Sequence, residues 1–514
     1  VRLQAIKTLS QLTDYPRGIR NTIEPLLADP DPAVRCRAAA TLLSTGSHPE
    51  AEKILLKMAK ANGSSEEEIS ERVLALEALV ETGNQDAYQI AANGLNDPSA
   101  EIRRVSAELI AQIDPQKCMI PLQKALGDEN ELVRQAAAEA LGRIGQPALE
   151  PVLASLRNPQ LEEGAILALQ HLPAHRARTE IKEYADRQVD QALHYHDLWR
   201  NCQGYISSQQ EATAGENGTV NQPNFDRGLL LADSLIYNAR YHGTNALRAM
   251  AALGNKEAIN LAVDNLSSDV AGQRANAIET LDSIGDPDVV RSLMPLWERA
   301  DSAMIPPDSQ WLEKTLQDED PWIRSCGAFL AKGISEKSLR PLLEEMVEND
   351  PDPLVRESAQ SEAHGVYDMD TMHTLSTMER ILFLHRVPLF ANLPPNDLKQ
   401  IAMIAREETF SDGAIIAEQG EAGDVLYIIV SGEVLVTSAD ENGQQSELGR
   451  RQPGEYVGEM AIISDEVRMA SLKALGEVRT LCINQSQFKE ILRLRPEASL
   501  AVMSVLCERL RELS

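Results

Sequence analysis

One short pattern recurs along the first two thirds of the chain and constrains its fold more than any other feature. An aspartate, often followed by proline, stands six residues before an arginine, and an alanine-rich apolar segment comes next. The clear copies of this pattern span residues 29–35, 97–103, 128–134, 318–324 and 350–356, and a looser copy spans 269–274. Arg2 and Arg35 are 33 residues apart, Arg103 and Arg134 are 31 apart, and Arg324 and Arg356 are 32 apart. Arg35 and Arg103 are 68 apart, which is two periods of 34 with a degenerate unit around Arg72, and such periods suit repeats of two short antiparallel helices.

The residues of the first clear copy indicate how such a repeat folds. We expect the aspartate to cap the next helix by accepting backbone N–H groups, and the proline to lie where a missing N–H costs little. Val34, Ala38 and Leu42 then recur at helical spacing and face the stack. The arginine is predicted to bond to an aspartate or a carbonyl oxygen of an adjacent turn. Because the arginines recur so regularly, this ladder is favoured over the alternative, phosphate binding.

This region resembles the HEAT-repeat proteins, and the resemblance predicts an all-α solenoid over residues 1–363. The array is expected to be irregular near 181–227 and 300–311. In the first of these stretches, longer helices flank residues 207–224, whose polar composition predicts a mobile surface loop. Solenoids present long binding surfaces, so we expect a protein partner on this one.

The charge of the chain restricts the kinds of partner it can bind. The chain has 49 Lys and Arg against 78 Asp and Glu, which gives a net charge of −29. So much negative charge repels nucleic acid and anionic lipid headgroups, and we therefore expect no nucleic-acid partner. No run of residues approaches the roughly 18 apolar positions that span a membrane, so we expect no direct membrane insertion of this segment.

The cysteines and the absence of catalytic motifs narrow the function further. The six cysteines are irregularly spaced and form no Cys-x-x-Cys pair, which predicts single buried thiols in a reducing, cytoplasmic compartment and no metal. The chain has no Walker loop, Gly-x-Gly-x-x-Gly, Ser-x-x-Lys or His-Glu-x-x-His motif. We therefore expect no catalytic residues and no enzyme activity.

The last third of the chain has a different pattern. A helical linker is predicted over residues 364–388, and period-two alternation then replaces helical spacing. Strand-like segments punctuated by glycines lie at 414–416, 425–430 and 434–436. Many short strands with glycine turns favour a sandwich or jelly-roll barrel, which we expect with flanking helices, an α+β domain, over residues 389–514.

These residues resemble the cyclic-nucleotide-binding domain family, which includes regulatory subunits of cyclic-AMP-dependent kinase, cyclic-nucleotide-gated channels and catabolite activator proteins. Glu418-Gln419-Gly420 and Ser431-Gly432-Glu433-Val434 match the opening strands of that family. The phosphate-binding segment of the family typically reads Phe-Gly-Glu-Leu-Ala-Leu, a few residues, then Pro-Arg-Ala-Ala-Thr. Residues 457–471 here read Val-Gly-Glu-Met-Ala-Ile-Ile-Ser-Asp-Glu-Val-Arg-Met-Ala-Ser, with Arg468 nine positions after Glu459 as in the family.

The resemblance implies roles for individual residues of this turn. Gly458 would let the backbone approach a ligand, and Glu459 would accept a hydrogen bond from the ribose 2′-hydroxyl. Arg468 would neutralise the cyclic phosphate, for which a guanidinium offers paired donors. The predicted ligand-binding residues are Val457, Gly458, Glu459, Met460, Ala461, Arg468, Met469, Ala470 and Ser471.

Four residues of the turn depart from the family pattern. Val467 replaces the usual proline, and Met469 stands where alanine or threonine is usual. A threonine there often accompanies cyclic GMP preference in the family, so its absence favours cyclic AMP. Asp465 and Glu466 add negative charge beside the expected phosphate.

Two functions follow from this combination of parts. The first is a regulatory scaffold that binds a cyclic nucleotide, with cyclic AMP favoured over cyclic GMP, and transmits the change to the solenoid. The alternative is a constitutive interaction platform with a degenerate pocket that binds no nucleotide. The alternative predicts that a side chain such as Met469 or Glu466 fills the site.

The order of the parts suggests a narrower resemblance. Residues 274–282 and 376–384, together with the order of repeats and sensor domain, look like the soluble tails of bacterial ATP/ADP-translocase-like or major-facilitator transporters. The chain begins at Val1, in what looks like the middle of a repeat. We therefore expect a piece of a longer protein, in which an upstream membrane domain would hold this part at the cytoplasmic face of a membrane.

Overall fold

A computed structural model of the chain divides into two compact units. Unit 1 consists of residues 1–190 and 242–297, and unit 2 of residues 191–241 and 298–514. The residues that the structure describes are 2–10, 17–214, 222–268, 270–298, 308, 310–334, 337–360, 374–390, 393, 395–439, 445–458, 467–494, 499, 502 and 503.

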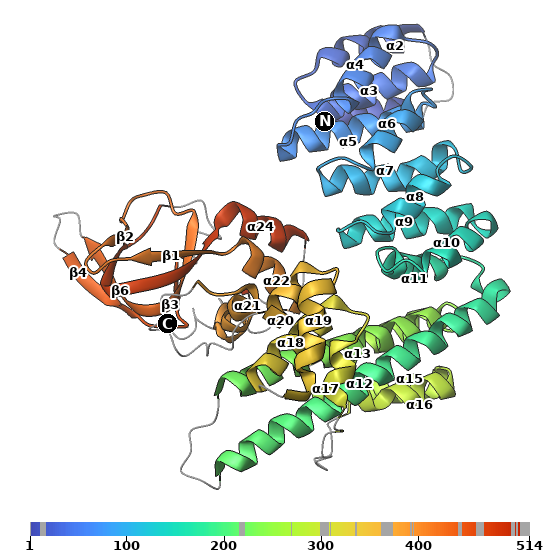
Figure 1. The fold of residues 1–514 in the computed structure, drawn as a ribbon. Coiled ribbons are helices and arrows are strands. Elements are labelled where there is room, and N and C mark those ends of the chain that lie inside the picture. The colour runs from blue at the N-terminus through green and yellow to red at the C-terminus, as the bar shows by residue number, and fades with distance from the viewer. Residues whose placement is uncertain are drawn as a thin grey trace. The chain divides into compact units, whose positions relative to one another are not determined.

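Unit 1 is built of short paired helices that follow one another along the chain (Figure 1). Two long helices, α12 and α13, run from one unit into the other. The helices up to α13 are α1 (Arg2–Ser10), α2 (Arg17–Ile23), η1 (Glu24–Ala28), α3 (Pro32–Ser44), α4 (Pro49–Ala59), α5 (Glu66–Glu81), α6 (Ala87–Gly94), α7 (Ala100–Ile113), α8 (Met119–Ala125), α9 (Glu131–Ile144), η2 (Gln146–Ala148), α10 (Leu149–Ser155), α11 (Glu162–Leu169), η3 (Ala174–Ala177), α12 (Arg178–Ala214) and α13 (Gln222–Ala251). Unit 1 ends with α14 (Lys256–Asn265), α15 (Ala271–Ile284), α16 (Pro287–Leu293) and η4 (Met294–Leu296).

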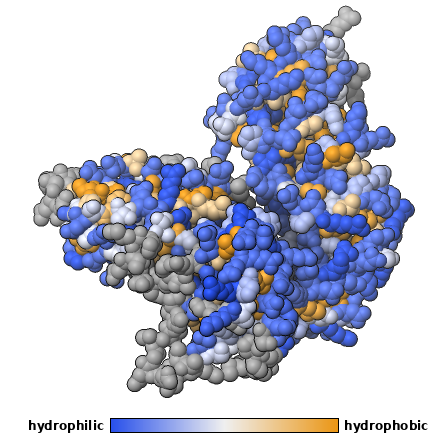
Figure 2. All heavy atoms as spheres, viewed as in Figure 1, coloured by the Kyte–Doolittle hydropathy of each residue, from blue (hydrophilic) through white to orange (hydrophobic). Residues whose placement is uncertain are grey.

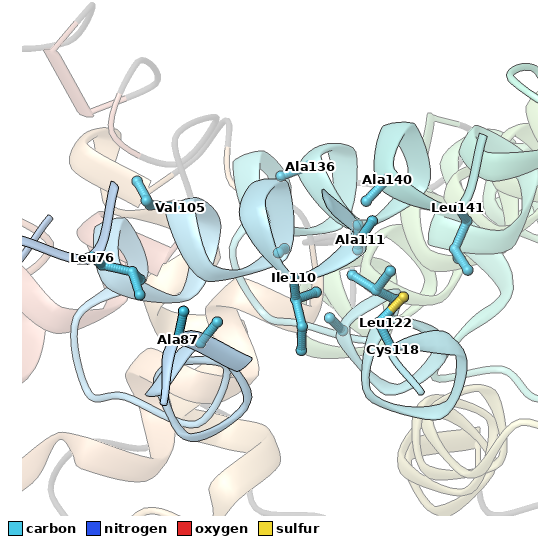
Figure 3. Packing of buried hydrophobic residues seen from close by; sticks show 14 of the residues in the cluster. Leu76, Ala87, Val105, Ile110, Ala111, Cys118, Leu122, Ala136, Ala140 and Leu141 are labelled. Atoms are coloured by element: carbon cyan, nitrogen blue, oxygen red, sulfur yellow. The ribbon is translucent and has the colours of Figure 1, made fainter. Parts of the chain in front are cut away.

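Alanine allows the repeats to pack closely in unit 1. Figure 3 shows Ile110 and Ala111 of α7, and Ala140 of α9, in one continuous layer of buried side chains. Ala111 and Ala140 carry only a methyl group, so the two helix backbones come near each other while larger residues such as Leu141 fill the space beside them. The predicted helical array is confirmed.

The arginine ladder is present, and its bonds follow one rule. Each arginine donates from Nη1 to the carbonyl oxygen six residues earlier, over 2.5 to 3.0 Å. The arginines that do so are Arg35, Arg103, Arg134, Arg274, Arg324 and Arg356. Several arginines also bind the aspartate at the start of the next copy, as Arg103 binds Asp128 and Arg324 binds Asp350. The arginines therefore join consecutive repeats.

The capping prediction was wrong by two residues. Asp29 accepts a hydrogen bond from the backbone N–H of Asp31, and Asp31 is the residue that caps α3, through the N–H of Ala33. The same shift occurs at Asp128, which accepts from Asn130, the cap of α9. The first aspartate cannot cap because its carboxylate closes a local turn and binds the ladder arginine.

Asp350 makes the stability of the ladder depend on pH. Burial would raise the pKa of the Asp350 carboxyl, but hydrogen bonds from Arg324 and the Asp352 backbone, with the Arg324 charge, outweigh burial and lower the pKa below 3.8. The folded carboxylate thus adds stability above pH 3.8, and this stability is lost as the pH falls through the lower folded pKa. We expect the melting temperature, followed by circular dichroism, to drop less steeply below that pH in Asp350→Asn than in the unmodified chain. An equal drop in both proteins would contradict this role.

Unit 2 begins with residues 191–214 of α12 and residues 222–241 of α13, which are followed by further short helices. These helices are α17 (Trp311–Leu316), α18 (Pro321–Ile334), η5 (Lys337–Leu339), α19 (Arg340–Asn349) and α20 (Pro353–Gln360). The predicted mobile loop at 207–224 was wrong at both ends, since α12 continues to Ala214 and α13 begins at Gln222. The Gln, Glu and Ala residues at the end of α12 favour helix although the segment is largely polar. Residues 215–221 lie outside the described residues, as does most of the stretch near 300–311.

The rest of unit 2 is an antiparallel sheet with flanking helices. Its strands pair in the order β1-β6-β3-β4, with β2 against β6 and β5 against β3. The elements are α21 (Thr377–Arg386), η6 (Pro388–Phe390), α22 (Pro395–Ile404), β1 (Arg406–Phe410), β2 (Ile415–Ala417), β3 (Val425–Ala439), β4 (Gln445–Arg451), β5 (Tyr456–Val457), β6 (Ser471–Asn484) and α24 (Gln485–Leu494). The structure therefore has the predicted fold class, an α-helical array followed by a β domain with flanking helices.

The glycine at 432 does not separate two strands as the sequence pattern predicts. Residues 425–439 form one strand, β3, and its pairing with β6 shifts register between Ile429 and Glu433. Gly432 has φ +83°, and a Cβ there would lie 2.3 Å from the Glu477 carbonyl oxygen. The glycine therefore forms a bulge in a continuous strand, where only a residue without a side chain fits.

The surface seen in Figure 2 is largely hydrophilic, and hydrophobic residues are scattered among the hydrophilic ones. None of the helices in the described ranges combines the length and apolar character needed to cross a bilayer. The five cysteines in those ranges are buried and form no disulfide, and Cys507 lies outside them.

Candidate functional site

Arg468 lies just before β6, in a loop that contacts the loop before β3 and the first residue of that strand. Its backbone N–H donates to the Glu421 carbonyl oxygen at 2.8 Å, and its own carbonyl oxygen accepts from the Gly420 N–H at 2.9 Å. The guanidinium donates from Nη2 to the Val425 carbonyl oxygen at 3.3 Å, and its Cζ lies 5.2 Å from the centre of the Tyr427 ring. Backbone and side-chain contacts together hold this arginine in one place, with 9% of its surface exposed.

Arg468 differs from two other buried arginines, Arg103 and Arg479, in its charged partners. Arg103 is bound by the carboxylate of Asp128, and Arg479 of β6 by the carboxylate of Glu407. Among the residues that the structure describes, no carboxylate lies within ion-pair distance of Arg468. A buried cation normally has an anionic partner, because removing a charge from water is costly. This arrangement is therefore suited to an anionic ligand.

Gly458 lies directly after β5 and against the same arginine. It has φ +92°, and a Cβ on it would lie 2.9 Å from the Val425 carbonyl oxygen and 3.3 Å from Arg468 Nη1. The backbone of the turn therefore approaches β3 and the guanidinium more closely than any residue with a side chain would allow. Glycine is needed here both for its backbone angle and for space.

The two requirements at Gly458 can be separated by comparison with Gly454. Gly454 has φ +87°, yet a Cβ there would meet nothing within 4 Å. We expect Gly454→Ala to cost about 1 to 2 kcal/mol of unfolding free energy from backbone strain alone. Gly458→Ala should cost a further 1 to 3 kcal/mol or so because of the added crowding. Urea unfolding of both variants measures the difference, and equal losses would show that the close approach contributes nothing.

The structure describes some of the other predicted site residues and not others. Glu459, Met460 and Ala461 lie outside the described residues, as do Asp465 and Glu466. Val457 is buried on β5 opposite Tyr427, and Ala470 is half-buried. Ser471 begins β6, and its hydroxyl accepts from the Gln419 backbone N–H at 3.0 Å.

The residues on either side of Arg468 face solvent. Val467 is 60% exposed and Met469 is 69% exposed. Arg468 is thus turned inward while its two neighbours are turned outward. Met469 therefore does not fill the site, contrary to what the degenerate-pocket alternative predicts for it.

The sequence patterns missed two side chains of the site. The ring of Tyr427 lies against the Arg468 guanidinium, and burial raises the pKa of Tyr427 while the Arg468 charge partly lowers it. The side-chain amide of Gln419 bonds both the N–H and the carbonyl oxygen of Ala439, which fixes the loop before β3 to the end of that strand. Both contacts join residues far apart in the sequence, so no local pattern could reveal them.

Comparison with known proteins assigns a class to this fold and turn. Residues 407–495 match the cyclic nucleotide-binding domain family, and residues 89–172 match HEAT repeats. The chain thus contains HEAT repeats followed by a cyclic nucleotide-binding domain.

The relatives of this domain include proteins of two kinds of kinase. A cAMP-dependent protein kinase regulatory subunit of Blastocladiella emersonii is 33% identical over 110 residues, which are 21% of this chain and 27% of that protein. The cGMP-dependent protein kinase 2 of Homo sapiens is 37% identical over 110 residues, 21% of this chain and 14% of that protein. A structure of the regulatory domain of Toxoplasma gondii PKA with cAMP has 29% identity and a TM-score of 0.24, and covers 26% of this chain and 50% of that one. The chain thus spans only about a quarter or less of the length of these two kinase relatives.

Proposed function

We propose that this protein is a regulatory scaffold whose C-terminal domain binds a cyclic nucleotide at the turn formed by residues 457–471. One observation carries the proposal: Arg468 is buried against Gly458 and Tyr427, and no carboxylate of the described residues neutralises it. A cyclic phosphate supplies the missing negative charge, and a guanidinium offers it paired donors. In this proposal Gly458 leaves room for the sugar-phosphate, while Glu459 accepts a bond from the ribose.

We favour cyclic AMP over cyclic GMP as the ligand. The preference rests on Met469, which occupies a position where threonine often accompanies cyclic GMP in the family. Its side chain is exposed and brings no hydroxyl or amide to the turn. The related kinases include both cAMP-dependent and cGMP-dependent proteins, so the preference depends on the residues of this chain.

Binding is proposed to act on the repeats, with no catalysis by this chain. The HEAT repeats supply a protein-binding surface, and a nucleotide can shift them only by binding one of their arrangements more tightly than another. The partner is proposed to be a protein. The resemblance of residues 274–282 and 376–384 to transporter tails supports a membrane transporter domain in that role, with this part at its cytoplasmic face.

Calorimetric titration of the full chain tests the proposal. Cyclic AMP is expected to bind with a lower Kd than cyclic GMP, and 5′-AMP, which lacks the cyclic diester, serves as the matched control ligand. If neither cyclic nucleotide binds more tightly than about 1 mM, the protein is instead a constitutive platform with a degenerate pocket. If cyclic GMP binds more tightly, the assignment of cyclic AMP is wrong while the binding function stands.

A further inference from the structure

The helix that precedes the nucleotide-binding sheet is tied by charge to a helix of the preceding array. Arg386, at the end of α21, is ion-paired with Asp226 of α13. His385 Nε2 lies 3.2 Å from Asp233 Oδ2, two turns further along α13. At the other end of α21, the Thr377 backbone N–H donates to Glu357 Oε1 of α20 at 2.8 Å. Both ends of α21 are therefore fixed to helices of the array.

The residue next to Asp226 in α13 is a buried arginine, Arg227. Arg227 of α13 is 2% exposed, and its Cζ lies 4.2 Å from the centre of the Phe329 ring of α18. Burial lowers the pKa of Arg227, and the carboxylate of Glu379 in α21 opposes that effect. The charge of Arg227 is thus stabilised in part from across the contact, so moving α21 away would cost energy inside the array.

A second helix of the sensor makes a separate contact. Lys399 Nζ of α22 lies 5.9 Å from the centre of the Trp322 ring at the start of α18. The same indole donates to the Ser234 hydroxyl of α13 at 3.0 Å. The pair α21–α22 therefore meets the pair α13–α18 at two places.

The same α21 is also tied to the sheet. The Glu407 carboxylate of β1 accepts from the Leu375 backbone N–H, just before α21, at 3.0 Å and from Arg479 Nε of β6 at 3.0 Å. Arg380 of α21 donates to the Ala405 carbonyl oxygen at 3.3 Å. A displacement of the sheet relative to the array must therefore strain α21 or break these bonds.

A chain of contacts leads from the phosphate turn to the same helices. Arg468 holds the Val425 carbonyl at the start of β3, and the adjacent Asp424 carbonyl accepts from the Gln485 N–H at the start of α24 at 2.7 Å. Phe488 of α24 then packs edge-to-face on Phe390 of η6, with 5.9 Å between ring centres and both rings fully buried. Directly before η6 lies the end of α21 that bears Arg386.

We propose that the contact of α21 with α13, through Asp226–Arg386 and Asp233–His385, is the coupling interface by which nucleotide occupancy changes the helical array. This inference rests on the proposed function. Coupling between two sites is reciprocal, so if the nucleotide changes the docking of α21, loosening that docking must in turn change the affinity for nucleotide, at most by the factor that couples the two equilibria.

The test compares the unmodified full chain with the double variant Asp226→Asn/Asp233→Asn. The matched control is Asp264→Asn, which removes an aspartate that is exposed as Asp233 is, and that is ion-paired with Arg248 in unit 1. Two quantities are measured in each protein: the Kd for cyclic AMP, and amide hydrogen exchange in α21 with and without cyclic AMP. We expect amide exchange in α21 to be faster in the double variant than in the unmodified chain. The Kd of the double variant for cyclic AMP should differ from that of the unmodified chain by about fivefold or more, and the Kd of the control should stay within about twofold of it.

The direction in which the Kd changes follows from the effect of cyclic AMP on hydrogen exchange in α21 of the unmodified chain. If cyclic AMP speeds exchange in α21, the double variant must bind cyclic AMP more tightly, and if it slows exchange, more weakly. An unchanged Kd with faster exchange, the opposite sign, or unchanged exchange in α21 would each overturn the coupling while leaving nucleotide binding intact. If the unmodified chain binds no cyclic nucleotide, the proposed function fails and the coupling fails with it.

Discussion

Replacing Arg468 with alanine should abolish most of the affinity for cyclic AMP. The guanidinium is buried and is the cation that the proposed site offers to the phosphate. Removing one member of a buried, hydrogen-bonded charge pair costs about 2 to 5 kcal/mol. The Kd measured by calorimetry should therefore rise by roughly 30-fold or more. Arg468→Lys keeps the charge without the planar fork, and we expect an intermediate loss.

Arg450 provides the matched control for this substitution. It lies on β4 of the same sheet, half-exposed, and pairs with Glu447 and Glu433. Arg450→Ala should leave the Kd within about twofold, because exposed ion pairs contribute little. Circular dichroism before titration verifies that each variant is folded. An Arg468→Ala variant that is folded and binds as tightly as the unmodified chain would remove Arg468 from the site.

Replacing Arg103 with alanine should strongly destabilise the repeats. Arg103 binds both oxygens of Asp128, at 2.8 and 3.0 Å, and the carbonyl oxygens of Asp97 and Pro98. Without it, the largely buried Asp128 carboxylate loses its counter-charge. Breaking a buried pair in this way costs about 3 to 5 kcal/mol, which urea unfolding measures directly.

The neighbouring residue provides a control within the same helix. Arg104 also pairs with two carboxylates, those of Glu101 and Glu108, but these pairs lie at the surface of α7. Arg104→Ala should cost less than about 1 kcal/mol. Equal losses for Arg103→Ala and Arg104→Ala would show that the ladder contributes no more than ordinary surface pairs.

The sequence predicted the repeats well because their signal is local. The aspartate–arginine spacing places each guanidinium near the carbonyl six residues earlier, and that bond recurs in the structure. The identity of the capping residue could not be predicted, because Asp29 and Asp31 are equally suited to cap. Only the position of Arg2, which binds Asp29, decides between them.

The candidate site was predictable only in part. Gly458 and Arg468 could be chosen because their spacing in the chain matches a family pattern, whereas their roles toward a ligand stay predictions. The stacking of Tyr427 on Arg468 depends on how β3 is positioned against a distant loop. Gly432 appeared to end a strand because a bulge and a turn both need a glycine with positive φ, and only strand pairing distinguishes them.

Hydrogen exchange of the unmodified full chain, with and without saturating cyclic AMP, tests the central claim that nucleotide bound at the turn acts on the helical array. We predict slower exchange at Gly458 and from Arg468 to Ser471, together with a changed rate in α21 and in the part of α13 from Asp226 to Asp233. Identical exchange in the two states, or protection confined to the turn with α21 and α13 unchanged, would contradict the account.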